Sequence, residues 1–154
     1  MRKVVSIPMW VVICFAVGFL ASYLQEESLQ TWYPLLRRSV LTPPNIVFPI
    51  VWSILYLLMG ISAGIVTGSQ HPHRRPVLAI FIIQLVLNFM WCIFFFTLRH
   101  PLLGFVDILV LDAAVLLYIV RSREVSRVAS YLFIPYILWL LMASYLNGYI
   151  LMCN

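Results

Sequence analysis

The chain carries no charged side chain between residues 76 and 98, where it reads PVLAIFIIQLVLNFMWCIFFFTL. This stretch is longer than the roughly 20 apolar residues that an α-helix needs to cross a bilayer. Three further charge-free stretches of sufficient length are residues 4–25, 39–70 and 128–154. A fifth span is predicted over residues 102–120, which are apolar except for Asp107 and Asp112. The sequence therefore predicts a protein that crosses a membrane five times.

The composition supports this interpretation. Of the 154 residues, 64% are hydrophobic and 10% are charged, whereas soluble domains average about 45 to 50% and about 25%. An outer-membrane barrel would show segments of about ten residues with alternating polarity, but the apolar stretches here are long and continuous. We therefore predict an all-α bundle of five transmembrane helices.

The predicted helices form one transmembrane domain over residues 1–154. They cover approximately residues 4–24, 46–68, 77–98, 102–120 and 129–151. The connections are short except for residues 25–45, which include an aromatic pair and a Thr-Pro-Pro run. Long loops in compact domains are commonly functional lids, so we interpret residues 25–45 as a lid.

The net charge of +5 arises from Lys and Arg residues that lie almost entirely in the connections. Basic connections favour the cytoplasmic side of a membrane. With the N-terminus inside, the inner side holds Arg2, Lys3, Arg74, Arg75, Arg121, Arg123 and Arg127, and the outer side holds Arg37, Arg38 and Arg99. We therefore predict an inside N-terminus, an outside C-terminus, a bacterial cell membrane and no nucleic-acid partner.

Three predicted helices carry aromatic, small and amide side chains on one face, because residues four positions apart share a helix face. The faces consist of Trp52, Tyr56 and Gly60, of Gln84, Asn88 and Trp91, and of Pro135, Trp139, Ala143 and Asn147. Amide and indole groups find no partner in lipid, so we expect these faces to point into the bundle. Two interpretations stay open: the faces pack helices together, or their tryptophans surround an apolar cavity that fits a flat molecule.

Two carboxylates, Asp107 and Asp112, fall inside the fourth predicted helix. An intramembrane carboxylate is a functional hypothesis by default because it is costly without a partner. The two residues differ by about 140° around the helix axis, so they cannot form an acid pair on one face. For Asp107, which lies near the start of this helix where the dipole is favourable, we favour a helix cap or a hydrogen bond to a neighbouring helix over a proton relay.

Metal and catalytic motifs are not evident. His71 and His73 have no third ligand nearby in sequence, and Cys14, Cys92 and Cys153 lack the spacing of a metal or disulfide framework. The sequence also offers no catalytic triad order and no Gly-rich phosphate loop. We therefore predict no metal site and no required cofactor.

Several motifs follow one another along the chain. They are Trp32-Tyr33-x-x-Leu36, Thr42-Pro43-Pro44, Trp52-x-x-Leu55-Tyr56-x-x-x-Gly60, Gln84-x-x-x-Asn88-x-x-Trp91 with Phe94-Phe95, Asp107, and Pro135-Tyr136-x-x-Trp139-x-x-x-Ala143-x-x-x-Asn147. Together they resemble the translocator protein family, also called the tryptophan-rich sensory protein (TspO) family. The resemblance covers nearly the whole chain.

This resemblance implies a five-helix bundle, often a homodimer, whose first loop closes a pocket for porphyrins such as protoporphyrin IX and haem. By position, Trp52 and Trp139 correspond to the pocket tryptophans and Trp32 to the lid. Arg37 and Arg38 could supply cations for the porphyrin propionates. The predicted ligand-binding residues are Trp32, Arg38, Trp52, Tyr56, Asn88, Trp91, Phe105, Trp139, Ala143 and Asn147. The expected partners are membrane lipid, a tetrapyrrole and a second copy of the chain.

The lid and the fourth helix depart from the family pattern. Where the family usually reads Lys-Pro-x-Trp before Thr-Pro-Pro, this chain has Arg38, Ser39 and Leu41. Ile46 stands where another tryptophan is frequent, and Phe105 stands where animal members carry tryptophan. These departures concern contacts of the lid and the choice of ligand.

We therefore expect a membrane receptor or carrier that serves tetrapyrrole regulation or transport. It would bind porphyrins between the first, second, third and fifth predicted helices, under the first loop. In this role porphyrin or haem is a ligand and not a required cofactor. One alternative is an enzyme that degrades bound porphyrin in light, with Trp52 and Trp139 as the oxidisable groups. The other alternative is a scaffold protein whose inward faces only pack the helices together.

Overall fold

The structure, a computed structural model, describes residues 2–154, with side chains from Ser6 onward. Its helices are α1 (Arg2–Thr31), α2 (Val47–Gly68), α3 (Arg74–Cys92), α4 (Pro101–Val125), α5 (Arg127–Tyr131) and α6 (Ile134–Cys153), with short turns η1 (Tyr33–Leu35) and η2 (Ile93–Thr97). Five segments are long and apolar enough to cross a membrane: Ser6–Thr31, Val47–Gly68, Arg74–Thr97, Pro101–Val125 and Arg127–Cys153. The prediction of an all-α, multi-pass membrane protein is confirmed.

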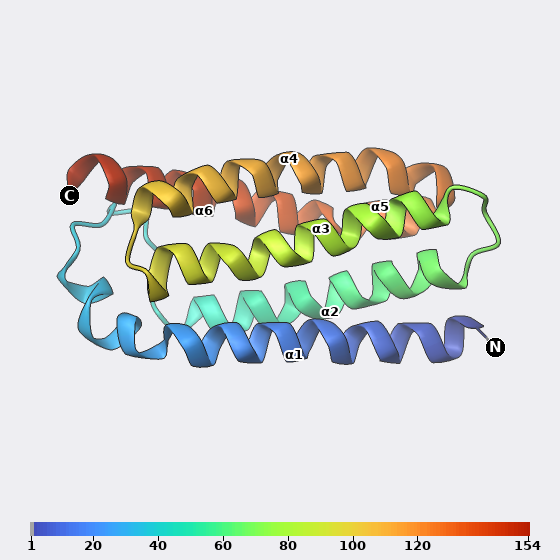
Figure 1. The fold of residues 1–154 in the computed structure, drawn as a ribbon, viewed down its shortest axis with the longest axis horizontal. Helices are drawn as coiled ribbons and strands as arrows, with labels where there is room; N and C mark the ends of the chain where they lie inside the picture. The colour runs from blue at the N-terminus through green and yellow to red at the C-terminus, as the bar shows by residue number, and fades with distance from the viewer. Residues whose placement is uncertain (1) are drawn as a thin grey trace.

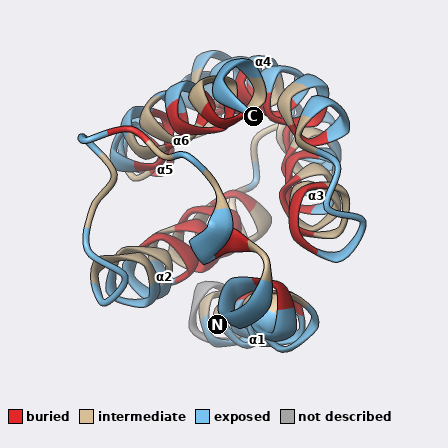
Figure 2. Ribbon diagram, turned by 90° about the vertical axis from the view of Figure 1, so that its left-hand side faces the viewer, coloured by how far each residue is buried: buried red, intermediate tan, exposed pale blue. Residues whose placement is uncertain are grey.

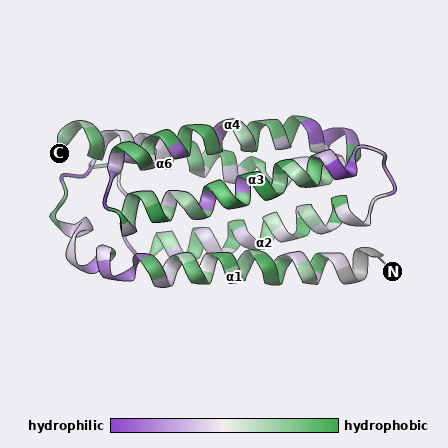
Figure 3. Cartoon of the chain, viewed as in Figure 1, coloured by the Kyte–Doolittle hydropathy of each residue, from purple (hydrophilic) through white to green (hydrophobic). Residues whose placement is uncertain are grey.

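The five spans lie side by side, and the two chain ends lie at opposite ends of the bundle (Figure 1). Viewed along its length, the bundle is a ring in the order α1, α2, α6, α4, α3, with buried residues facing the centre (Figure 2). Hydrophobic residues cover the spans, and hydrophilic residues gather at the connections (Figure 3). The side of the membrane that each end faces stays a prediction.

The start of α1 packs closely against α2 because two glycines of α2 leave room for its backbone. A Cβ on Gly60 would lie 2.5 Å from Cα of Val11, and a Cβ on Gly64 would lie 2.5 Å from Cα of Ile7. Small residues permit such close helix approach in membranes. Nearby, the indole of Trp10 donates a hydrogen bond to a hydroxyl of α2, at 2.8 Å. This end of the bundle is therefore tightly closed.

At the other end, α1 continues to Thr31 and does not end near residue 24 as predicted. The predicted end was placed where the charged residues begin, but Glu and Gln favour the helix as well as Leu does. The added turns are held in place by Ser28, whose hydroxyl donates to the carbonyl of Phe96 at 2.5 Å. The loop between the first two spans is consequently shorter than residues 25–45.

The last two spans also differ from their predicted bounds. α4 extends to Val125, past residue 120, because the Arg and Glu residues after the apolar stretch are good helix formers. The last span is not one continuous helix, since α5 ends at Tyr131 and α6 begins at Ile134. Pro135 has no backbone N–H to bond the carbonyl of Tyr131, which explains the interruption.

The third span ends in a π-helical turn, η2, which the sequence analysis did not predict. A π turn widens the helix and shifts the direction of the side chains after it. Here two consecutive residues, Phe95 and Phe96, are both buried, with ring centroids 4.8 Å apart. The turn thus places a cluster of aromatic rings beneath the loop between α1 and α2.

Candidate functional site

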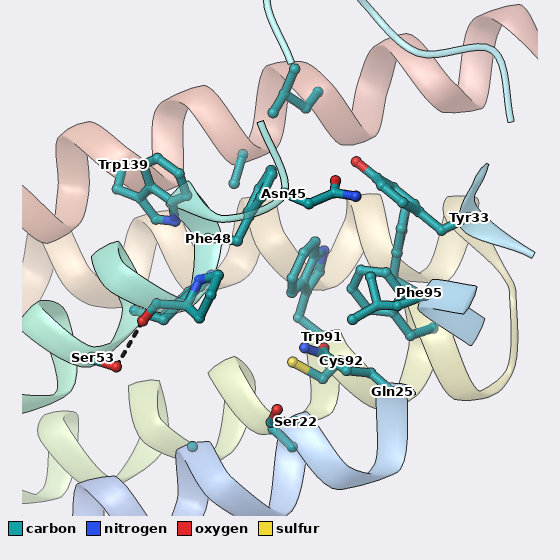
Figure 4. Close-up of a pocket in the computed structure, with 18 of the residues that line it drawn as sticks. Ser22, Gln25, Tyr33, Asn45, Phe48, Ser53, Trp91, Cys92, Phe95 and Trp139 are labelled. Carbon is teal, nitrogen blue, oxygen red and sulfur yellow. Dashed lines mark hydrogen bonds between the residues drawn. The ribbon is translucent and has the colours of Figure 1, made fainter. Parts of the chain in front are cut away.

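A cavity of about 620 Å³ lies within the bundle at the end that holds this loop. Small-molecule sites typically occupy about 300 to 1,000 Å³. The cavity is lined by Phe15, Gly18, Phe19, Ala21, Ser22, Gln25, Leu29, Gln30, Tyr33, Asn45, Phe48, Pro49, Trp52, Ser53, Tyr56, Trp91, Cys92, Phe95, Phe96, Trp139, Ala143, Leu146, Asn147 and Ile150. These residues come from α1, η1, α2, α3, η2, α6 and the loop (Figure 4).

Three tryptophans form much of the cavity wall. Trp52 comes from α2, Trp91 from α3 and Trp139 from α6. Trp91 stacks on Phe95 with ring centroids 5.4 Å apart and an angle of 19° between the planes. Phe48 meets Trp139 edge to face at 5.6 Å. The cavity is therefore bounded on several sides by flat aromatic surfaces.

The indole N–H groups of the cavity differ in their bonding. Trp91 donates its indole N–H to the Oδ1 of Asn147 at 3.0 Å, and the amide of Asn147 donates to the Pro101 carbonyl at 3.0 Å. By contrast, the buried Nε1 of Trp139 has no hydrogen-bond partner among the described residues. A buried donor without a partner is costly, so a bound molecule with an acceptor group would stabilise this position.

A hydrogen-bond network supports the wall around Tyr56. Its hydroxyl donates to the Oδ1 of Asn88 at 2.8 Å, and the amide of Asn88 donates to the hydroxyl of Tyr136 at 2.7 Å. Asn88 is 1% exposed and does not line the cavity. Its amide joins α2, α3 and α6 and so positions Tyr56, which does line the cavity.

The loop is tied to α6 at two places. The side chain of Asn154 accepts from the backbone N–H of Arg37 at 2.9 Å and donates to its carbonyl at 3.0 Å. The hydroxyls of Ser39 and Tyr145 lie 2.9 Å apart. The loop therefore lies against α6 at the end of the cavity, as a lid would.

Of the ten predicted ligand-binding residues, six line the cavity: Trp52, Tyr56, Trp91, Trp139, Ala143 and Asn147. The other four, including Asn88, lie outside its lining. Trp32 packs edge to face on Phe95 at 5.5 Å, and its neighbour Tyr33 lines the cavity in its place. Phe105 lies on α4, facing Gly148 of α6.

Arg38, the fourth of these, borders a second cavity within the loop. This cavity of about 510 Å³ is lined by Leu36, Arg38, Ser39, Thr42, Pro43, Pro44 and Asn45. The guanidinium carbon of Arg38 lies 4.8 Å from the ring centroid of Tyr33. Asn45 borders both cavities, so the cationic loop cavity adjoins the aromatic one.

The predicted pocket included the first helix, but none of the predicted ligand-binding residues lies on it. The structure adds Phe15, Gly18, Phe19, Ala21, Ser22, Gln25, Leu29 and Gln30 from this helix. The spacing of Gly18, Ser22 and Gln25 in the sequence could have indicated this face of the helix, because it places small and polar side chains on one side. A Cβ on Gly18 would lie 2.5 Å from the ring of Tyr56, so this glycine lets the ring approach α1.

Neither carboxylate of α4 lines the cavity. Oδ2 of Asp112 accepts from the hydroxyl of Ser144 on α6 at 2.6 Å. Asp107 is also buried, and the expected bond from a helix end or a neighbouring helix is not seen, since its Oδ2 has no hydrogen-bond partner among the described residues. The positions of these two groups assign neither of them to ligand binding.

Comparison with known proteins assigns the chain to a family. The family model described as TspO/MBR matches residues 10–152. The chain belongs to the TspO/MBR family. The resemblance inferred from the motifs is thereby confirmed.

Relatives in this family come from archaea, bacteria and animals. The chain is 44% identical over 139 residues to the tryptophan-rich protein TspO of Archaeoglobus fulgidus, an alignment that covers 90% of each protein. It is 35% identical over 155 residues to the TspO of Chlorobaculum tepidum, covering 99% of this chain and 98% of the relative. It is 32% identical over 137 residues to the human translocator protein, covering 87% and 79%.

Proposed function

We propose that this TspO/MBR family member is a membrane receptor or carrier that binds porphyrins, such as protoporphyrin IX or haem, in the tryptophan-lined cavity. The observation that carries the proposal is the convergence of Trp52, Trp91 and Trp139 from three helices on one cavity of about 620 Å³. Aromatic faces stack favourably on flat conjugated rings. A porphyrin is a large planar ring of this kind.

Polar groups around the cavity suit the acidic substituents of such a ligand. Arg38 forms no ion pair among the described residues, since the ion pair found there joins His73 and Glu124. Its guanidinium carbon lies 4.8 Å from the ring centroid of Tyr33, which lines the aromatic cavity. A guanidinium binds carboxylates through charge-assisted hydrogen bonds, so a porphyrin propionate is a fitting partner for Arg38.

A purely structural role predicts a bundle filled by its own side chains. The cavity, and the unpaired indole N–H of Trp139 in its wall, favour ligand binding over that role. Binding is tested by titrating protoporphyrin IX into the purified protein in the dark, following the porphyrin absorption band.

The matched variants of this titration change tryptophans inside and outside the cavity. The double variant W52L/W139L is expected to lose saturable binding, whereas W10L is expected to retain it because Trp10 lies against Thr67 and Phe81, away from the cavity. Unchanged affinity of the folded double variant would contradict the proposal.

A second candidate activity is light-driven oxidation of the bound porphyrin. It is favoured by one observation, that the oxidisable indoles of Trp52 and Trp139 line the same cavity. Illumination in the presence of dioxygen should then yield an open-chain product faster with the wild type than with W52L/W139L. Equal rates with both proteins, or with free porphyrin in detergent, would remove the case for an enzyme.

A further inference from the structure

The contact between α2 and the last span is close at only one end. There, Ser62 donates a hydrogen bond from its hydroxyl to the Ala129 carbonyl at 2.7 Å. Toward the lid, α2 and α6 make no extended backbone contact. No hydrogen bond joins α2 to α6 among the residues that the structure describes. The two helices thus diverge as they approach the cavity.

Aromatic side chains fill the resulting gap. Phe48 meets Trp139 at 5.6 Å and 72°, and Trp52 meets Tyr136 at 6.3 Å and 72°. Phe48 and Trp139 both line the cavity, and each is only partly buried. Figure 4 shows these two rings next to each other at one side of the cavity. The pair therefore separates the cavity from the outer surface of the bundle.

The outer surface at this place is apolar and belongs to two membrane spans. Near the pair, Val51 of α2, three residues after Phe48, is partly exposed, and Leu138 of α6, adjacent to Trp139 in the chain, is 63% exposed. Both lie in segments long and apolar enough to cross the membrane. The hydrocarbon of the bilayer is consequently the medium outside the Phe48–Trp139 pair.

Other boundaries of the cavity are held more firmly. Beside the cavity, α1 and α2 approach closely, because a Cβ on Gly18 would lie 2.5 Å from the ring of Tyr56. The lid is tied to α6 by the two hydrogen bonds between Asn154 and the backbone of Arg37. By contrast, the gap between α2 and α6 can open by rotation of two partly exposed side chains, without breaking a hydrogen bond.

We infer that the gap between α2 and α6 is a lateral gate that the side chains of Phe48 and Trp139 close, and through which a flat apolar ligand enters the cavity from the bilayer. The inference rests on the proposed ligand-binding function of the cavity. On this route the ligand reaches the cavity through the hydrocarbon of the bilayer, where such molecules accumulate. The lid stays in place while the ligand enters. The route would serve planar molecules that partition into lipid.

The gate is tested with the reconstituted protein and protoporphyrin IX supplied in the vesicle bilayer, by stopped-flow measurement in the dark. Removing the ring contact in F48A should raise both the association and the dissociation rate by roughly two- to ten-fold, as expected from the strength of an aromatic pair. The matched variant N154A loosens the lid and should change both rates less than two-fold. Faster exchange in N154A but not in F48A would overturn the gate.

A second measurement does not depend on porphyrin. Lipids brominated near the middle of the acyl chain quench tryptophans that they touch, and Trp91 lies inside the cavity, stacked on Phe95. Comparison of the wild type with W91F isolates the quenching of Trp91, which should occur and increase in F48A. Quenching of Trp91 in a protein that does not bind porphyrin would contradict porphyrin as the ligand but would support the gate. Absence of this quenching in both proteins would overturn the gate.

Discussion

Trp91 of α3 and Asn147 of α6 are joined by a 3.0 Å hydrogen bond at the cavity wall. The bond uses the indole N–H, which leaves the ring of Trp91 fixed between Phe95 and the cavity. Asn147 is itself held by the Pro101 carbonyl of α4. One amide thus connects three spans and orients an aromatic surface of the proposed binding site.

Replacing Asn147 by Ala should therefore lower both stability and porphyrin affinity. Two buried hydrogen bonds are lost, and in membrane proteins such bonds contribute up to about 1.7 kcal/mol each. We expect the free energy of unfolding to fall by about 1 to 2 kcal/mol, measured by denaturation in detergent. Asn154→Ala, at an exposed amide, should have a smaller effect on stability. An equal loss in both variants would contradict the assigned role of Asn147.

Tyr56 and Asn88 should be energetically coupled. The hydroxyl of Tyr56 donates to Asn88 across α2 and α3, so removing either group abolishes the same bond. A double-mutant cycle of unfolding free energies with Y56F, N88A and the double variant should give a coupling energy of about 0.5 kcal/mol or more. Ser53→Ala serves as the control, since this hydroxyl bonds a carbonyl of its own helix. Additive effects of Y56F and N88A would rule out the coupling.

Gly60 should not tolerate a larger side chain. A methyl group at this position would lie 2.5 Å from the backbone of Val11, so α1 would have to move. We expect Gly60→Ala to destabilise the bundle by about 1 to 3 kcal/mol, observed as a lower midpoint of thermal unfolding. In Gly148→Ala the atoms nearest to the new methyl belong to the ring of Phe105, from 3.1 Å, and the shift should be smaller. Equal midpoints for both variants would contradict the close α1–α2 packing.

Arg38 should recognise the carboxylates of the ligand. Hydrogen bonds to charged groups contribute about 1.5 to 3 kcal/mol, so Arg38→Gln should weaken protoporphyrin IX binding by about ten-fold or more. The dimethyl ester of protoporphyrin IX, which has no carboxylate, should bind both proteins alike. Arg37→Gln is the control, because Arg37 is exposed and borders neither cavity. If Arg38→Gln weakened binding of the ester equally, carboxylate recognition would be excluded.

The number and type of the spans could be predicted because they depend on the length of the apolar stretches. Their ends depend on other forces. α1 continues to Thr31 because its polar residues still favour helix and because Ser28 bonds the third span. The π turn at η2 leaves no periodic signal in a stretch made almost entirely of apolar residues. For these reasons the bounds of the helices and their local interruptions could be determined only from the structure.

The site could be predicted where a residue type required an inward position, as for Trp52, Trp91 and Trp139. The prediction included the first helix in the pocket but named none of its residues, because most of its cavity residues are apolar and could equally face lipid. It placed Asn88 in the lining, whereas both ends of this amide are engaged by tyrosine hydroxyls behind the wall. Phe105 faces Gly148 because α4 packs on α6. These placements depend on tertiary packing.

The central claim is that porphyrin binds among Trp52, Trp91 and Trp139. The most direct test is an NMR titration of protein labelled with ¹⁵N-tryptophan, whose 5 indole N–H resonances are assigned by single substitutions. Addition of protoporphyrin IX in the dark should shift the resonances of Trp52, Trp91 and Trp139 through the ring current of the porphyrin. The resonance of Trp10 should not move. Saturable binding that leaves the three cavity resonances unchanged would contradict the account.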